Sequence, residues 1–316
     1  MPCLKTLAIT LLCATLTASA QNPARMPFGP HPKLGQSHSG APAAAATGVG
    51  NNPFLLIDYP RSIANQTPIG INDKGRIVGY ALFADGSFRG YLLQGTTFKD
   101  IVYPGAAGTG AFGINKSGLI VGFYCPDLNC DSSHGFMLKG KTYTSLDFPG
   151  AVFTAPNAVN DSGDIVGYYG TPDFATHGFL LHNGVYTSID VPGAIQTITN
   201  GINKQGIIVG FFVNPDGTGG GFTLENGVFT TVNYPGASGT ELDAINDSGD
   251  IVGAYQNAGD NHNYGFLLSG GVFTAFNVPF PGSISTIPWG INNKHQIVGS
   301  YGSYPPDYFF GFLTTY

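Results

Sequence analysis

The sequence predicts an all-β fold built from tandem repeats, and two observations predict it. The 316 residues include 47 glycines and 22 prolines, which interrupt helices and supply turn geometry, so many short strands are expected. A tripeptide of the Gly-Ile-Asn type also recurs six times, at intervals of 43 to 46 residues. Its marker asparagines are Asn72, Asn115, Asn160, Asn203, Asn246 and Asn292.

Each repeat contains about four short strands. In the third, the turn Asn160–Gly163 leads into an apolar strand at 164–168, and a second strand follows at 177–181. Asn183-Gly184 is a two-residue hairpin signal before a strand at 185–190. The chain then passes through a Pro-Gly turn into the next marker. Four strands per unit of this length are typical of a β-propeller blade.

The two ends of the repeated region predict that the ring closes. Residues 54–60 match the fourth strand of a repeat and residues 311–313 match the third, so the two fragments complement each other. A closed ring avoids the exposed strand edges of an open solenoid. We therefore expect a six-bladed β-propeller over residues 53–316. Either one blade combines strands from both termini or the fourth-type strand begins every blade, and the sequence allows both.

The N-terminus predicts export. Lys5 precedes an apolar stretch, and Ala18-Ser19-Ala20 is a small-residue cleavage site before Gln21, so residues 1–20 are expected to be a signal peptide. Residues 21–52 are rich in Pro, Ala, Gly and Ser and are expected to be a flexible linker. We expect a secreted or extracellular monomer, in the periplasm or at the cell surface as alternatives, with no membrane span in the mature chain.

Cysteine content agrees with an oxidising compartment. Only Cys125 and Cys130 remain outside the predicted signal, and their spacing lets one loop fold back into a small disulfide. Two thiols without companion Cys or His fall short of the four ligands of a structural zinc site.

The charge balance excludes one class of partner. The formal net charge is −6, with 13 Lys and Arg residues and no basic run. Nucleic-acid binding depends on cationic surfaces, so no nucleic-acid partner is expected.

The repeats resemble a known family. The pattern Gly-Ile-Asn-x-x-Gly-x-Ile-Val-Gly followed by His-Gly-Phe-Leu is similar to the bacterial extracellular HAF repeats, named for a His-Ala-Phe tripeptide, and the resemblance covers residues 54–316. The tripeptide is His-Gly-Phe at His134 and His177, and other residues replace the histidine in the remaining repeats. The resemblance implies export and repetition but no activity and no catalytic residues.

Three sets of polar residues are interpreted as structural. His134 and His177 are expected at partly exposed strand edges. A column of acids and amides two residues before Pro, which includes Asp147 and Asp190, is expected to hydrogen-bond the backbone of the Pro-Gly turn. The segments 160–164 and 246–250 resemble calcium loops but lack the ligand count and terminal Glu of an EF-hand. We expect hairpin turns there, with no metal and no cofactor.

One position, three residues before each marker, changes its chemistry from repeat to repeat. In a closed ring this variable column forms a circle around the axis. It consists of Ile69, Phe112, Asn157, Asn200, Asp243 and Trp289. With Glu241 nearby, aromatic faces beside amides and carboxylates suit a sugar or a peptide. The alternative is ordinary packing between blades.

The sequence therefore favours a non-catalytic, secreted protein that binds a carbohydrate or an extracellular protein. One rival hypothesis is a polysaccharide hydrolase or lyase that uses Asp243 and Glu241. The other is a structural envelope or matrix protein.

Overall fold

The computed structural model describes residues 46–47, 53–60, 62, 66–128, 130, 132–173, 175–259, 262–303 and 308–316. These residues form 25 β-strands and no helix, which confirms the all-β prediction. The predicted signal peptide lies outside the described residues. Of the predicted linker, only the strand β1 (Ala46–Thr47) is described, and it pairs with β2. No helix in the described part of the chain is long and apolar enough to cross a membrane.

Consecutive strands pair into antiparallel arrays of four. The first array contains β3 (Gln66–Ile71), β4 (Ile77–Leu82), β5 (Phe88–Gln94) and β6 (Thr97–Ile101). The second contains β7 (Gly108–Ile114), β8 (Ile120–Cys125), β9 (His134–Lys139) and β10 (Thr142–Leu146). The third contains β11 (Phe153–Val159), β12 (Ile165–Gly170), β13 (Thr176–His182) and β14 (Val185–Ile189).

Two further arrays repeat the same order. The fourth contains β15 (Gln196–Ile202), β16 (Ile208–Val213), β17 (Gly219–Glu225) and β18 (Val228–Val232). The fifth contains β19 (Gly239–Ile245), β20 (Ile251–Gln256), β21 (Tyr264–Ser269) and β22 (Val272–Phe276).

The sixth array combines the two ends of the chain. It contains β23 (Ser283–Ile291), β24 (Gln296–Ser303), β25 (Tyr308–Thr315) and β2 (Pro53–Ile57). The N-terminal β2 is its outer strand, and Leu56 lies opposite Phe312 in antiparallel register. Of the two closure modes that the sequence allows, the structure therefore has the shared array.

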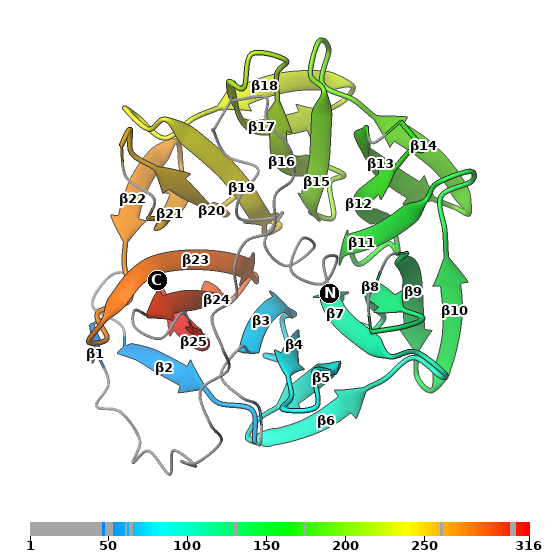
Figure 1. The fold of residues 1–316 in the computed structure, drawn as a ribbon. Helices are drawn as coiled ribbons and strands as arrows, with labels where there is room; N and C mark the ends of the chain where they lie inside the picture. The colour runs from blue at the N-terminus through cyan, green and yellow to red at the C-terminus, as the bar shows by residue number, and fades with distance from the viewer. Residues whose placement is uncertain are drawn as a thin grey trace.

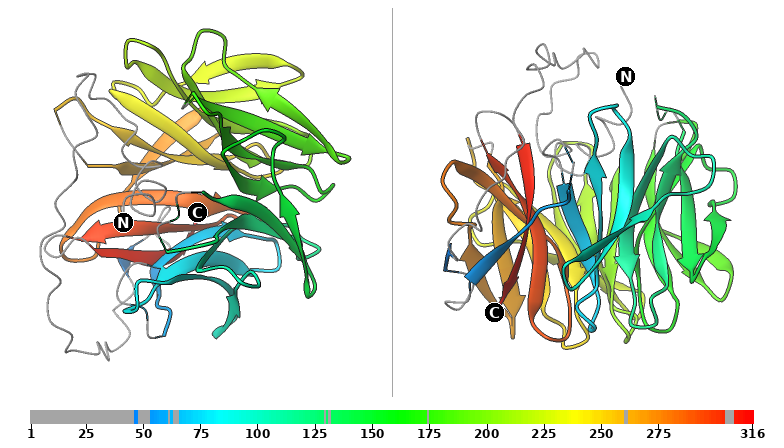
Figure 2. Two further views of the ribbon diagram at one scale, coloured as in Figure 1. Left: turned by 45° about the vertical axis from the view of Figure 1, so that its right-hand side comes forward. Right: turned by 90° about the horizontal axis from the view of Figure 1, so that it is seen from below.

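The arrays surround a common centre, as Figure 1 shows. The first strand of each array lies nearest the centre, and each contacts the first strand of the next array. The contact between β23 and β3 completes the circuit. In the side view of Figure 2 the strands of neighbouring arrays stand side by side.

The marker asparagines are linked in a ring of hydrogen bonds. Each donates its side-chain Nδ2 to the backbone carbonyl of the next marker, at 2.9 to 3.4 Å. The six bonds are Asn72 to Asn115, Asn115 to Asn160, Asn160 to Asn203, Asn203 to Asn246, Asn246 to Asn292, and Asn292 to Asn72. We call this the asparagine ring.

The side-chain oxygen Oδ1 of a marker asparagine stabilises the turn that follows that asparagine. In the third repeat Asn160 Oδ1 accepts the backbone N–H groups of Ser162 and Asp164, at 3.0 and 2.9 Å. Gly163 closes the same turn in the left-handed region, at φ 92°, which favours glycine. The marker position needs a donor for the ring and an acceptor for the turn, and an amide supplies both. The predicted hairpin at 160–164 is thus explained without a metal.

The core lies between neighbouring arrays. The valine of each Ile-Val-Gly segment is fully buried, as Val121 and Val166 illustrate, and so are the aromatic side chains of the third strands, such as Phe136 and Phe179. The glycine that follows the valine allows close approach of the first strand, because a Cβ on Gly167 would lie 2.2 Å from the carbonyl oxygen of Ala155. This close packing makes the inner strands rigid, and a site on those strands is rigid as well.

The prediction that the acid and amide column caps the Pro-Gly turn is wrong for Asp147 and Asp190. Asp190 contacts His177 Nδ1 at 2.6 Å, and Asp147 contacts His134 Nδ1 at 3.1 Å. Buried threonines cap the turn instead, because the backbone N–H of the residue after the column donates to a Thr Oγ1 six or eight residues later. These threonines are Thr109, Thr154, Thr197, Thr240 and Thr286.

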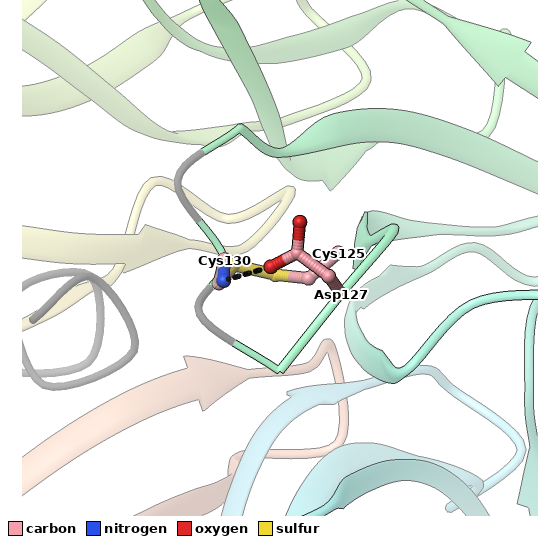
Figure 3. Close-up of a disulfide and its surroundings, with 3 residues drawn as sticks. All are labelled: Cys125, Asp127 and Cys130. Atoms are coloured by element: carbon pink, nitrogen blue, oxygen red, sulfur yellow. Dashed lines mark hydrogen bonds between the residues drawn. A yellow bond between two sulfur atoms is a disulfide. The ribbon is translucent and has the colours of Figure 1, made fainter. Parts of the chain in front are cut away.

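Cys125 and Cys130 form a disulfide, as predicted (Figure 3). Their Cα atoms are 5.0 Å apart, and both side chains are buried. Asp127 Oδ1 accepts the backbone N–H of Cys130 at 3.0 Å. The disulfide therefore restrains the end of β8.

Candidate binding site in the central channel

All six residues of the variable column line one cavity of about 130 Å³ at the centre of the molecule. Each comes from the first strand of a different array, so the ring brings together side chains that lie 43 to 46 residues apart in the sequence. Glu241, the remaining predicted site residue, is buried on β19 but is not on the cavity wall. We call this space the central pocket.

Two amides form a hydrogen-bonded chain along one side of the central pocket. Asn157 Nδ2 donates to the backbone carbonyl of Thr199 and to Asn200 Oδ1, both at 3.1 Å. Asn200 Nδ2 donates in turn to the carbonyl of Leu242 at 3.1 Å. These bonds fix both amides and leave Asn157 Oδ1 buried without a partner in the described structure.

Asp243 follows Asn200 around the circle, and an ionised carboxylate has no N–H with which to continue the chain. Its side chain is only 4% exposed, and both carboxyl oxygens are buried without a hydrogen-bond partner in the part of the chain that the structure describes. Unpaired buried polar atoms are rare in folded proteins because each costs its full desolvation free energy. Asp243 is therefore the strongest indication of a ligand in this pocket.

A second buried acid, Glu241, interacts with Asp243, and we call these two residues the acid pair. Glu241 precedes Asp243 by two residues on β19, and Asp243 lies at the irregularity where the pairing with β20 shifts between Leu242 and Ala244. Burial raises the pKa of the Glu241 carboxyl well above its ordinary range, and the nearby Asp243 raises it further. Burial also raises the pKa of Asp243 well above its ordinary range. Each acid is thus harder to ionise than an exposed carboxyl.

Aromatic side chains form another part of the wall. Trp289 donates its indole Nε1–H to Ser300 Oγ at 2.9 Å, which fixes the plane of the indole. Phe112 packs against Tyr80 and Phe123, with ring centroids 6.2 and 5.1 Å apart. The central pocket is therefore amphipathic, with fixed aromatic faces and fixed oxygen acceptors.

A second repeated position accounts for the space that the acid pair and Trp289 occupy. This position was not identified from the sequence. The residue after each Ile-Val-Gly segment is aromatic in the first four arrays and small in the last two. The six are Tyr80, Phe123, Tyr168, Phe211, Ala254 and Ser300. Ala254 is the register partner of Glu241, and Ser300 holds Trp289. The small residues thus occur in the two arrays that carry the acid pair and the indole.

A ring of aliphatic side chains separates the central pocket from a second cavity of about 80 Å³. The same six residues line both spaces: Ile71, Ile114, Val159, Ile202, Ile245 and Ile291. The second cavity is lined mainly by marker asparagines, which the asparagine ring already engages, and by the residues that follow them. A polar ligand in the central pocket therefore meets an apolar floor.

The two histidines do not belong to this site. His134 and His177 contact Asp147 and Asp190, and none of these four residues lies on the cavity wall. Among the residues described, no group of three or more His, Cys, Asp or Glu side chains is placed to hold a metal ion.

The comparisons with known proteins reveal the fold alone. No protein-family model and no curated protein sequence matches the chain. AofleA from Arthrobotrys oligospora is similar with a TM-score of 0.55 and 12% identity, over 84% of this chain and 87% of that one. XC5397 from Xanthomonas campestris, described as a gluconolactonase, has a TM-score of 0.52 and 13% identity, over 88% and 96%.

A third similar structure is a variant of the Aleuria aurantia lectin AAL in complex with Fucalpha1-6GlcNAc. Its TM-score is 0.49 at 10% identity, over 76% of this chain and 89% of that one. At identities this low none of these likenesses assigns a ligand or an activity to this chain.

Proposed function

We propose that this chain is an exported six-bladed β-propeller that binds a carbohydrate in the central pocket without catalysing a reaction. The closed asparagine ring and the shared sixth array support the propeller. A single observation carries the binding function: the variable column surrounds a cavity whose wall retains buried, unpartnered oxygens at Asn157 and Asp243 among the described residues. A ligand that donates hydrogen bonds relieves that cost.

The shape of the wall supports a sugar. A pyranose ring has an apolar C–H face and a rim of hydroxyl groups, and the pocket offers the matching aromatic face at Trp289 and Phe112 beside the oxygen acceptors. The cavity of about 130 Å³ is near the size of an engineered cavity that holds benzene, about 150 Å³. The volume therefore limits the enclosed part of a ligand to a single ring at most.

The acid pair supports a second candidate, a polysaccharide hydrolase or lyase. Glycosidases need two carboxyl groups of opposite protonation on either side of the scissile bond, and different environments separate their pKa values. Glu241 and Asp243 lie on one strand, and burial raises the pKa of both. The arrangement therefore favours binding over catalysis.

The binding function is tested on a glycan array with the mature chain, Trp289→Ala and the control Tyr264→Ala, which removes an aromatic ring from the outer stack of the fifth array. We expect specific binding by wild type and Tyr264→Ala and its loss in Trp289→Ala. An array without any signal would contradict carbohydrate binding and favour a protein partner or a structural role. Release of reducing ends from a bound polysaccharide would instead support the hydrolase.

Export and membership of the HAF family remain proposals. The sequence features that support them are the cleavage site before Gln21 and the six repeats. Mass spectrometry of the protein secreted by its source cells tests the first, and we expect the mature chain to begin at Gln21. A chain that retains residues 1–20 in the cytoplasm would contradict export.

A further inference from the structure

The buried, unpartnered side-chain atoms that the structure describes on the wall of the central pocket are all oxygens, and all of them are acceptors when Asp243 is ionised. They are Asn157 Oδ1 and the two carboxyl oxygens of Asp243. The N–H groups of Asn157 and Trp289 already donate within the protein. The pocket therefore selects a ligand by what it donates.

The pocket also carries acidity without a balancing cation. Among the described residues of the cavity wall there is no Lys, Arg or His. Neither Glu241 nor Asp243 takes part in an ion pair with any described residue, since every ion pair lies elsewhere. A buried carboxylate is strongly destabilised unless a positive charge or several donors approach it.

We propose that the sugar bound in the central pocket carries a free amine, and that the Asp243 carboxylate, with Glu241 behind it, receives the ammonium group. This inference rests on the proposed carbohydrate-binding function. An ammonium supplies positive charge and three N–H donors, which suit the two oxygens of Asp243. The sugar hydroxyls then remain for Asn157 Oδ1, and the ring lies against Trp289 and Phe112.

The protonation of the pair makes the recognition measurable. Burial raises the pKa of both carboxyls, and an ammonium that stabilises the carboxylates lowers it again, so a protonated acid releases its proton into the solvent when the ammonium binds. The other titratable group on the described wall is Tyr80 of β4, whose pKa burial also raises, so it stays neutral near pH 7. A proton that the described wall of the pocket releases on binding therefore comes from the acid pair.

Three oligosaccharides of equal length and linkage isolate the amine. Glucosamine, N-acetylglucosamine and glucose oligomers with β-1,4 linkages differ only at the second carbon, where they carry an ammonium, an acetamide or a hydroxyl. We expect calorimetry with the wild-type mature chain to give at least about tenfold tighter binding of the glucosamine oligomer, with proton release in buffers of different ionisation enthalpy.

Two variants locate the effect. Asp243→Asn keeps the size of the side chain and removes the charge, so we expect it to lose the preference for the amine while neutral sugars still bind. Glu225→Gln, an exposed acid at the end of β17, is the matched control and should keep the preference. Equal binding of all three oligomers by wild type would overturn the amine inference alone. Failure of every glycan to bind would overturn the carbohydrate function as well, and neither result depends on the folding of a variant.

Discussion

Asn292 donates its side-chain amide to the backbone carbonyl of Asn72 at 2.9 Å, across 220 residues of sequence. This bond completes the asparagine ring, and both residues are buried. The oxygen of the same side chain accepts the backbone N–H groups of Lys294 and Gln296, both at 3.0 Å. One amide thus stabilises a local turn and joins the last array to the first.

The two roles of Asn292 can be separated by Asn292→Asp, which keeps the acceptor and removes the donor. We expect a loss of about 1–3 kcal/mol of unfolding free energy, because the carbonyl of Asn72 loses its partner and meets a carboxylate. Urea unfolding measures it. The control Asn257→Asp changes an exposed residue and should shift the unfolding free energy by less than about 0.5 kcal/mol. Equal effects of the two substitutions would contradict the role of the ring.

The N-terminal strand β2 is expected to stabilise the sixth array through the side chain of Phe54. This side chain is 2% exposed and packs edge-on against Phe312 of β25, with ring centroids 5.4 Å apart. We expect Phe54→Ala to lower the unfolding free energy by about 3–5 kcal/mol, because it leaves a cavity between the two ends of the chain. Leu55→Ala, next to it but 51% exposed, is the control and should cost less than about 1 kcal/mol. Thermal unfolding of both variants measures these losses. A Phe54→Ala variant as stable as wild type would argue against closure by β2.

The repeat predicts the fold well because each marker asparagine belongs to a turn with a recognisable sequence. The positions of these turns determine where the strands between them begin and end. The closure mode does not follow from the repeat. Residues 53–57 have the pattern of a fourth strand in either arrangement, and only the register of Leu56 against Phe312 distinguishes the two.

The site could be predicted only in part. The circle of residues around the axis follows from the repeat, and all six members line the central pocket. The unpartnered state of Asp243 depends on the hydrogen bonds of Asn157 and Asn200, which a sequence does not contain. The turn caps were misassigned for a similar reason: Thr154 and Asp147 both lie near one turn, and the fold decides which of them reaches the backbone.

The disulfide between Cys125 and Cys130 closes a short loop at the end of β8. On the chain-entropy model a loop of this size stabilises the folded state by about 2 kcal/mol. We expect the double variant Cys125→Ala and Cys130→Ala to lose about that amount in urea unfolding. A reducing agent should lower the stability of wild type and leave the double variant unchanged. A wild-type transition that does not respond to reduction would contradict this role.

The acid pair is expected to make the protein less stable as the pH rises. The pKa values of Glu241 and Asp243 in the folded state lie well above the ordinary values of 4.5 and 3.8, because both carboxyls are buried. Above those ordinary values the unfolded chain releases protons that the folded protein retains. The unfolding free energy therefore falls with pH, by up to about 1.4 kcal/mol per pH unit for each retained proton, until the folded-state pKa is passed.

Urea unfolding of wild type and of the double variant Glu241→Gln and Asp243→Asn, between about pH 5 and pH 8, measures this dependence. The double variant should be the more stable protein at the upper end of the range, and the difference should shrink toward the lower end. A glucosamine oligomer should reduce the difference as well, because its ammonium stabilises the ionised pair. Parallel curves for the two proteins would mean that the two acids ionise at their ordinary pKa values. The predicted destabilisation by the acid pair would then be wrong.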